Sequence, residues 1–285
     1  HYYRDVDGNP TQEPANIRYS LNPLVKLFGA ESLEEFGPLK LIQVREQMID
    51  NDLSRRCINQ RVGRIKRMFK WAVSHQMISP FIYQAISTVE GLKRGRTRAR
   101  EGKKIRPADE KHVYMVLEYT TPVVAAMIEL QLLTGMRPGE LVQLKPKDID
   151  RSGEIWHYYP ERHKNQHRGH ERIVAIGPRG QELLRPYLLR NENSYCFSPA
   201  ESEKARREEI TAKRKTPLSY GNSVGTNRRE NPQRRPGDHY DSAGYGKAVR
   251  SAIKAAKRAI KARGGDPDKE LPRWRPYQLR HTAAT

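Results

Sequence analysis

The sequence predicts a mainly α-helical protein with a small antiparallel β-sheet, divided into two domains. Two segments, 54–75 and 246–263, repeat apolar residues at helical spacing. Two short strand-like segments, 155–159 and 172–177, are separated by a polar loop, as in a β-hairpin. Between the halves, residues 92–106 hold eight bases and one acid and too few apolar residues to fold alone, so we expect a linker.

The N-terminal part is predicted to be all helical. Residues 16–50 contain two short helices, separated by a Gly-Ala-Glu-Ser turn and a break at Gly37-Pro38. Ser54 is suited to cap the next helix, which runs to about His75 and ends before Ser79-Pro80. The apolar residues of this helix form its buried face: Ile58, Val62, Ile65, Phe69 and Ala72. Basic residues lie on the opposite face: Arg56, Arg64, Arg67 and Lys70.

The second part mixes helices with the strand pair. Residues 108–119 and 122–134 are predicted helices, and the second is almost entirely apolar, which places it in the core. Residues 179–190 return to a helix after the strands. The helix 246–263 has an apolar face and a basic face. The first consists of Val249, Ile253, Ala256 and Ile260, and the second of Arg250, Lys254, Lys257, Arg258 and Lys261.

Two segments near the C-terminus have no complete apolar pattern. Residues 198–243 are charged and rich in Pro, Gly and Asn, which predicts an insertion or a disordered basic arm rather than a core element. Residues 277–285 have the pattern of the first turns of a helix and stop without a cap. We therefore expect the polypeptide to be incomplete at this end.

Composition limits the class of protein. The chain has 285 residues, with 53 Lys+Arg against 33 Asp+Glu and a formal net charge of +20. So much positive charge suits binding to a polyanion or to an anionic membrane surface. No run approaches the roughly 18 consecutive apolar residues of a membrane span. The two cysteines, Cys57 and Cys196, suit a reducing compartment such as the cytoplasm. These observations exclude secreted, membrane-spanning and fibrous classes and favour a nucleic-acid partner.

The positive charge is unevenly distributed. Residues 1–52 hold nine acids and five bases, whereas residues 53–89 and 247–263 each hold seven bases and no acid. Together with the basic segment 92–106, these stretches predict several walls of one groove for a polyanion.

Two short motifs are the candidates for chemistry. The first is Leu133-Thr-Gly-Met-Arg-Pro-Gly-Glu-Leu141, in which an apolar helix breaks at Gly135 and presents Arg137. The second is Pro276-Tyr-Gln-Leu-Arg-His-Thr-Ala-Ala-Thr285. With these motifs the chain resembles the tyrosine recombinase and phage-integrase family. That family has a Thr-Gly-x-Arg-x-x-Glu-Leu block, matched by Arg137 and Glu140, and a His-x-x-Arg-His block, matched except that Tyr277 replaces the first histidine.

The resemblance implies a domain plan. Residues 1–91 would form a helical, SAM-like core-binding domain, and residues 92–106 a basic interdomain linker. Residues 107–285 would form the α+β catalytic domain of a tyrosine recombinase, with a basic insertion at about 198–243.

The resemblance also implies a reaction. A tyrosine hydroxyl attacks a DNA phosphodiester and leaves a 3′-phosphotyrosyl bond and a 5′-hydroxyl, and a second strand's 5′-hydroxyl reverses the step. Bond energy is conserved, so neither a metal nor a nucleotide cofactor is required. Arg137 and Arg280 would clamp the phosphorane oxygens, and Lys164, upstream of the strand that starts at Arg172, would protonate the leaving 5′-oxygen. Glu140 would orient Arg137 rather than touch DNA.

Two departures from the family pattern qualify this expectation. Tyr277 can hydrogen-bond a phosphate oxygen, but a phenol is a poor base at neutral pH, and His281 is expected to pack rather than to titrate. The attacking tyrosine of the family lies a few dozen residues further on, beyond Thr285. We therefore expect this chain to bind DNA without cleaving it.

Duplex DNA is the expected partner, with a homotetramer on recombining sites implied by the family. Neither a membrane nor a nucleotide is expected as a partner. The residues expected to contact DNA are Arg56, Arg64, Arg67, Lys70, Lys93, Arg94, Arg96, Arg250, Lys254 and Lys257.

Two other classes remain as alternatives. His163, His167 and His170 offer possible metal ligands, although the flanking strand pattern favours a loop and no cysteine is near in sequence. A non-catalytic basic nucleic-acid-binding protein, including one derived from this fold, would explain the charge but not the two motifs. The absence of a GxxxxGK[ST] loop disfavours an NTPase.

Overall fold

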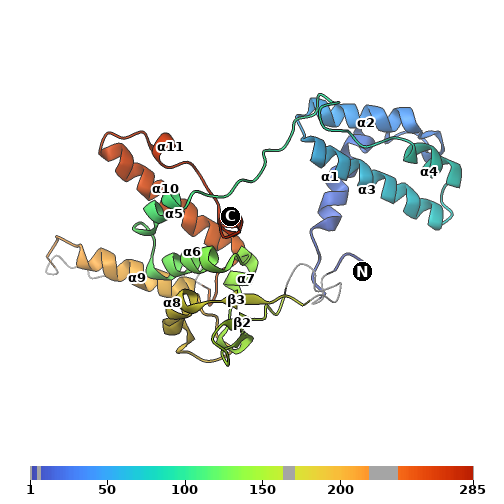
Figure 1. The fold of residues 1–285 in the computed structure, drawn as a ribbon. Helices are drawn as coiled ribbons and strands as arrows, with labels where there is room; N and C mark the ends of the chain where they lie inside the picture. Colours follow the sequence, from blue (N-terminus) through green and yellow to red (C-terminus); the bar gives the residue numbers. More distant parts are fainter. Residues whose placement is uncertain (1, 5–7, 163–170, 218–236, 285) are drawn as a thin grey trace. The chain divides into compact units, whose positions relative to one another are not determined.

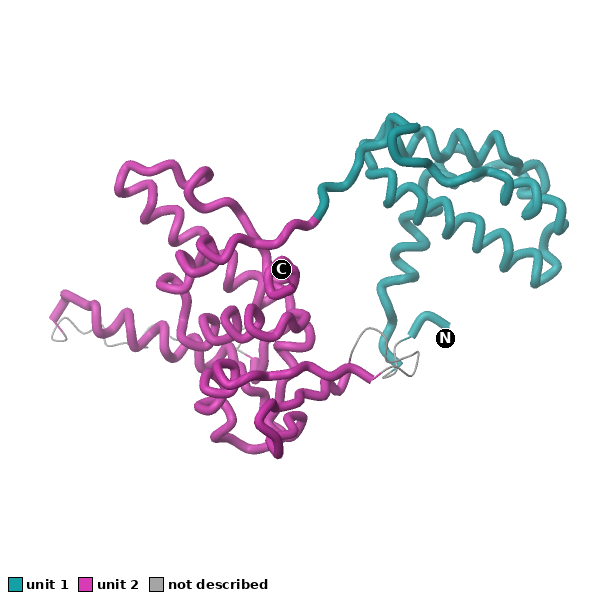
Figure 2. The backbone as a smooth tube through the Cα atoms, in the orientation of Figure 1, with its two compact units in different colours: residues 1–104 teal, residues 105–285 magenta. Residues whose placement is uncertain are grey.

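A computed structural model describes residues 2–4, 8–162, 171–217 and 237–284. The chain divides into two compact units, His1–Lys104 and Ile105–Thr285, drawn in different colours in Figure 2. Both are mainly helical, and the second contains a three-stranded antiparallel sheet, which confirms the predicted fold class. Within the described ranges, no helix combines the length and the apolarity needed to cross a membrane.

Unit 1 is a group of helices packed around α3 (Figure 1). Its elements are α1 (Glu13–Phe28), η1 (Leu33–Glu35), α2 (Pro38–Asp50), α3 (Arg55–Ser74) and α4 (Pro80–Ser87). Ser54 caps α3 by accepting a hydrogen bond from the Cys57 amide at 3.4 Å. All five apolar residues predicted for the inner face of α3 are buried, and Phe69 stacks on Phe36 with ring centroids 4.9 Å apart.

Most of the basic segment 92–106 lies along unit 1. Arg98 pairs with Glu46 and Asp50 of α2, and Arg55 pairs with Glu101. Ala99 is buried in the core of this unit. Arg98 thus pairs with two acids of the neighbouring helix, although the segment has few apolar residues of its own.

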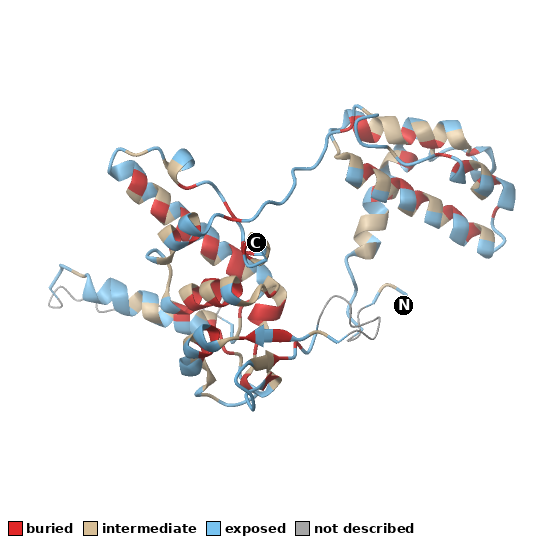
Figure 3. Cartoon of the chain, viewed as in Figure 1, coloured by how far each residue is buried: buried red, intermediate tan, exposed pale blue. Residues whose placement is uncertain are grey.

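Unit 2 is built around α6 and α10, whose buried residues are red in Figure 3. Its helices are α5 (Glu110–Leu117), α6 (Pro122–Thr134), α7 (Pro138–Val142), η2 (Pro146–Asp148), α8 (Pro178–Leu188), α9 (Pro199–Ala212), α10 (Ser242–Ala262), α11 (Pro267–Glu270) and α12 (Pro276–Thr282). The strands β1 (Ile149–Asp150), β2 (Trp156–Tyr158) and β3 (Val174–Ile176) pair in that order. Tyr158 lies opposite Ile149 in one pair and opposite Val174 in the other.

The segment 198–243, predicted to be an insertion or a disordered arm, begins with a helix. In α9, Ser198 caps the first turn, and Glu203 pairs with Arg206 and Arg207 one turn later. Such pairs stabilise a helix that has no apolar period. The buried Ser202 bonds to Thr121 at 2.9 Å and fixes α9 to the start of α6. Residues 218–236 lie outside the described residues.

Candidate active site

The break between α6 and α7 presents Arg137. Gly135 ends α6 in the left-handed conformation, with φ of 62°, which a residue with a Cβ adopts only at a cost. A Cβ at Gly135 would also lie 3.4 Å from the Cβ of Ala283, just after α12. Arg137 is the N-cap of α7 and Pro138 its first residue. The left-handed turn therefore favours glycine, and the C-terminal segment packs close to it at ordinary van der Waals distance.

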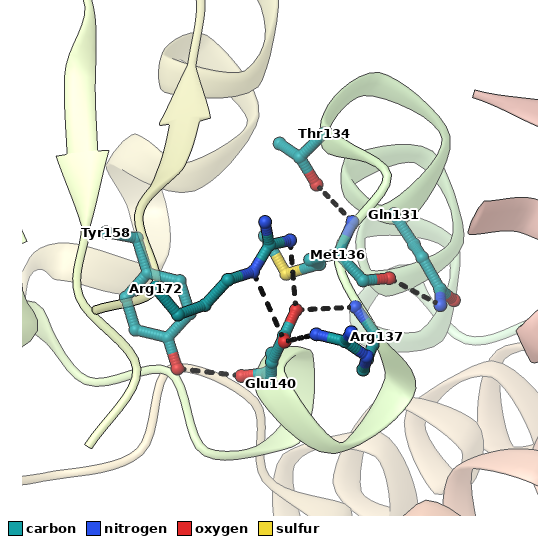
Figure 4. A network of polar contacts seen from close by, with 7 residues as sticks. All are labelled: Gln131, Thr134, Met136, Arg137, Glu140, Tyr158 and Arg172. Atoms are coloured by element: carbon teal, nitrogen blue, oxygen red, sulfur yellow. Dashed lines mark hydrogen bonds and ion pairs between the residues drawn. The ribbon is translucent and has the colours of Figure 1, made fainter. Parts of the chain in front are cut away.

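Glu140 is the centre of the polar network shown in Figure 4. Its side chain is 3% exposed and accepts two bonds from Arg137, one from the guanidinium at 2.6 Å and one from the backbone amide at 2.8 Å. Arg172 donates to the same carboxylate through two nitrogens, each at 3.4 Å. Tyr158 of β2 donates to the Glu140 carbonyl at 2.8 Å. One buried carboxylate thus holds two guanidiniums.

The electrostatics of Glu140 follow from this geometry. Burial by itself would raise the pKa of Glu140, because it penalises the charged form. The hydrogen bonds from Arg137 and the charge and hydrogen bonds of Arg172 outweigh burial and hold this pKa below its ordinary value. The carboxylate is therefore ionised at neutral pH and carries one negative charge between two arginines.

Arg172 contacts the Glu140 carboxylate with its side chain but was not predicted as a site residue. In the sequence it serves only to mark the start of a strand. Its position two residues before β3 was the available signal, because β3 pairs with β2, and Tyr158 of β2 contacts Glu140. The sequence does not show that a second arginine shares the buried acid.

Contacts with the start of unit 2 fix α12. The Thr282 hydroxyl bonds to both the carbonyl and the amide of Ala108, at 2.8 and 2.9 Å, and Gln278 donates to the Arg106 carbonyl at 2.9 Å. Leu279 is fully buried beneath the helix. These contacts hold the other face of α12, with Tyr277 and Arg280, toward less buried surroundings.

The two motif residues on α12 differ in exposure. Tyr277 is 44% exposed, and its ring lies edge-on to His281, with centroids 5.3 Å apart. Arg280 is half-buried, and its Nη1 is buried without a hydrogen-bond partner among the described residues. A buried charged donor without a partner is costly, which indicates a site that receives an anion.

A cavity of about 460 Å³ joins the two motifs. It is lined by Arg137, Pro138, Gly139, Glu140, Gln143, Arg162, Ser242 and Tyr277. The structure thus brings Arg137, Glu140 and Tyr277 to one cavity, with Arg280 one helical turn beyond Tyr277. Lys164 lies outside the described residues, two positions after Arg162.

A model of the phage integrase family matches residues 103–285. The chain belongs to the phage integrase family. No curated protein matches it.

Three solved structures show the same fold as this chain. A lambda integrase dimer bound to a COC′ core site matches with a TM-score of 0.61 and 14% identity, over 98% of this chain and 65% of that chain. The Tn1549 transposon integrase in complex with a circular intermediate DNA matches with a TM-score of 0.56 and 15% identity, over 97% and 81%. XerH site-specific recombinase bound to a palindromic difH substrate matches with a TM-score of 0.57 and 16% identity. The match covers 95% of this chain and 67% of that chain. The chain therefore spans 65% of the length of that lambda integrase.

The basic face of α3 is partly neutralised within unit 1. Glu13 of α1 accepts two bonds from Arg64, both at 2.9 Å, and one from Arg67 at 3.0 Å. The hydrogen bond from Arg64 is the main reason that the pKa of Glu13 lies below its ordinary value. Arg56 and Lys70 are exposed on the same helix. Arg64, which was predicted to contact DNA, has a side chain that is 19% exposed and is bound to Glu13, an acid that lies 51 residues earlier.

The other residues that are predicted to contact DNA lie at the surface. In unit 1, Arg94 and Arg96 are exposed, and Lys93 is exposed beside Glu90. On α10, Arg250 and Lys254 are exposed and Lys257 pairs with Asp268. The α10 residues also line a cavity of about 250 Å³ together with Ile253 and Arg273.

The metal alternative falls on residues that the structure does not describe. His163, His167 and His170 are all in the segment 163–170. Among the described residues, no group of three or more His, Cys, Asp and Glu side chains is placed to hold a metal ion.

Proposed function

We propose that this integrase is a site-specific DNA recombinase that cuts and rejoins strands through a 3′-phosphotyrosyl intermediate. One observation carries the proposal: Arg137, held by the buried Glu140, lines a cavity together with Tyr277. Arg280 lies one helical turn from Tyr277, and its Nη1 has no hydrogen-bond partner within the described part of the chain. Two guanidiniums on neighbouring elements suit a phosphate, because each can bond two oxygens and remains charged.

In the proposed reaction the arginines bind the non-bridging oxygens of the scissile phosphate. Negative charge on these oxygens increases in the phosphorane transition state, so fixed positive donors lower the barrier. Glu140 and Arg172 keep Arg137 in place and need not touch DNA. Tyr277 donates its hydroxyl to a phosphate oxygen, at the position where the family has histidine. The attacking tyrosine is proposed to lie outside these 285 residues.

Lys164 is proposed as the general acid that protonates the leaving 5′-oxygen. Replacing Lys164 with alanine should slow cleavage in a protein extended through the attacking tyrosine. A substrate with a bridging 5′-thiolate should restore the rate, because a thiolate leaves without a proton. Replacing Arg137 with lysine is the control and should show no such rescue. An unrescued Lys164→Ala variant would exclude this residue as the acid.

Both units are proposed to bind duplex DNA, unit 1 as the core-binding domain and unit 2 as the catalytic domain. The exposed basic residues on α3, in the segment 93–96 and on α10 support this proposal. A lambda integrase tetramer bound to a Holliday junction has the same fold, with a TM-score of 0.58 and 13% identity. We extend this assembly to the present chain as a proposed homotetramer on recombining sites.

Duplex binding should weaken steeply with salt. Each neutralised phosphate adds about −0.9 to the slope of log affinity against log salt, so six or more contacts give a slope of about −5 or steeper. The double variant Arg250→Gln/Lys254→Gln should make that slope shallower by about two. The control Lys204→Gln/Lys213→Gln changes one lysine of α9 and the lysine at its C-cap, which lie near Glu208 and Glu209, and should leave the slope unchanged. Fluorescence anisotropy over a salt series measures both. A total slope near −1 would contradict the proposed groove.

A further inference from the structure

Gln131 and Tyr245 form a polar contact in an apolar part of the core. Gln131 is on α6, Tyr245 is on α10, and both are fully buried. The Tyr245 hydroxyl lies 3.1 Å from Oε1 of Gln131, and Nε2 of Gln131 lies 3.0 Å from the Met136 carbonyl oxygen. Every other buried residue of α6 is apolar. The hydrogen bonds of this buried amide must therefore explain why a polar residue is found at this position.

The direction of these hydrogen bonds is determined by their ends. The Met136 carbonyl can only accept, so the Gln131 amide must turn its NH₂ group toward it. Oε1 then faces Tyr245 and can only accept, so the phenol must donate. Complete burial raises the pKa of Tyr245, which keeps this donor protonated. The result is a one-way relay from α10 through α6 to the backbone just before Arg137.

The relay ends on one particular peptide plane. The Met136 carbonyl and the Arg137 amide belong to the same planar group, which directly precedes the Arg137 Cα. Gln131 holds the carbonyl, and Glu140 holds the amide at 2.8 Å. Figure 4 shows both contacts. This plane lies beyond the left-handed Gly135, where the hydrogen-bond ladder of α6 has ended, so side chains supply what the helix no longer does.

We infer that Gln131 and Tyr245 are positioning residues for Arg137, which fix the peptide plane from which its side chain projects. The inference rests on the proposed role of Arg137 in binding the scissile phosphate. The relay also fixes the first turn of α10, whose Ser242 lines the same cavity as Arg137. A rigid clamp of this kind favours the transition state, because a small displacement of a charged donor lowers the rate.

The test compares Gln131→Met, Tyr245→Phe and the double variant in full-length protein that contains the attacking tyrosine. Each single variant should lower the single-turnover cleavage rate about tenfold while the Kd for duplex DNA stays unchanged. The double variant removes the amide and the phenol together, so its thermal midpoint should exceed that of Gln131→Met. Its cleavage should remain slow, because the Met136 carbonyl is still unheld. If the role of the two residues is purely structural, the cleavage rate and the thermal midpoint of the double variant should both recover relative to Gln131→Met. That result would overturn the inference.

A matched control and a second readout complete the design. Tyr240→Phe removes another buried phenol, bonded to Ser202 on α9, and should leave cleavage unchanged. Hydrogen exchange on the 285-residue chain should be faster at residues 134–140 in Tyr245→Phe and Gln131→Met and unchanged in α3. No change at residues 134–140 would overturn the relay. Faster exchange with a normal cleavage rate would overturn its role in positioning, whereas normal cleavage by Arg137→Lys would overturn the proposed function instead.

Discussion

Replacing Arg137 with lysine, or Arg280 with alanine, should lower the rate of DNA cleavage by about 100- to 1,000-fold, because each change removes a fixed donor from the transition state. Lysine at position 137 retains a cation beside the buried Glu140, so the change removes the planar fork without leaving the acid unpaired. The Arg280→Ala substitution should cost little folding stability, since the Nη1 of Arg280 has no hydrogen-bond partner among the described residues.

The measurement is single-turnover cleavage of a nicked duplex by protein extended through the attacking tyrosine, with duplex Kd measured in parallel. Arg179→Lys, at an exposed position of α8, is the matched control and should cleave at the normal rate. Near-normal cleavage by Arg137→Lys or Arg280→Ala would remove that residue from the active site. A parallel loss of duplex affinity would assign it to DNA binding rather than to catalysis.

Replacing Glu140 with glutamine should produce the largest loss of stability in unit 2. The neutral amide leaves the guanidiniums of Arg137 and Arg172 without their shared anion, and breaking a buried ion pair costs about 3–5 kcal/mol. Glu203→Gln is the matched control, because Glu203 also accepts from two arginines but is 28% exposed. Its loss should cost about 1 kcal/mol or less. Equal losses of unfolding free energy in the two variants would show that burial does not set the contribution of Glu140 to stability.

The pH dependence of this loss has a definite sign. The pKa of Glu140 is lower in the folded protein than its ordinary value of 4.5, so its contribution is present above that value and is lost as the pH falls through the folded pKa. The difference in unfolding free energy between the parent protein and Glu140→Gln should therefore narrow on acidification below pH 4.5. A Trp71→Phe background restricts the fluorescence signal to Trp156 and Trp274, both in unit 2. A difference in unfolding free energy that widens in acid would contradict the assignment of Glu140 as ionised at neutral pH.

The features that could be predicted from the sequence are those set by local pattern. The inner face of α3 repeats at helical spacing, and all of its predicted residues are buried. The Thr-Gly-x-Arg break needs a left-handed glycine, which the structure has at Gly135. Such features depend on neighbours within a turn or two, so one segment of sequence is enough to define them.

The features that could not be predicted depend on contacts between distant segments. Glu13 reaches Arg64 across 51 residues, and Tyr245 reaches Gln131 across 114. Neither partner has a local signal, because an acid on an N-terminal helix or a glutamine in an apolar helix has many possible environments. The helix α9 was not predicted for a related reason, since its cap and its Glu–Arg pairs stabilise a helix without the apolar period on which prediction relies.

Covalent capture on DNA tests the central claim most directly. The 285-residue chain and a version extended through the next tyrosine motif would each be incubated with a nicked suicide duplex, and adducts would be resolved on denaturing gels and mapped by mass spectrometry. The proposed function assigns Tyr277 a contact with a phosphate oxygen rather than the attack, so it predicts no adduct for the 285-residue chain. It predicts a 3′-phosphotyrosyl adduct for the extended protein. An adduct on Tyr277 in the 285-residue chain, or none in the extended protein, would contradict it.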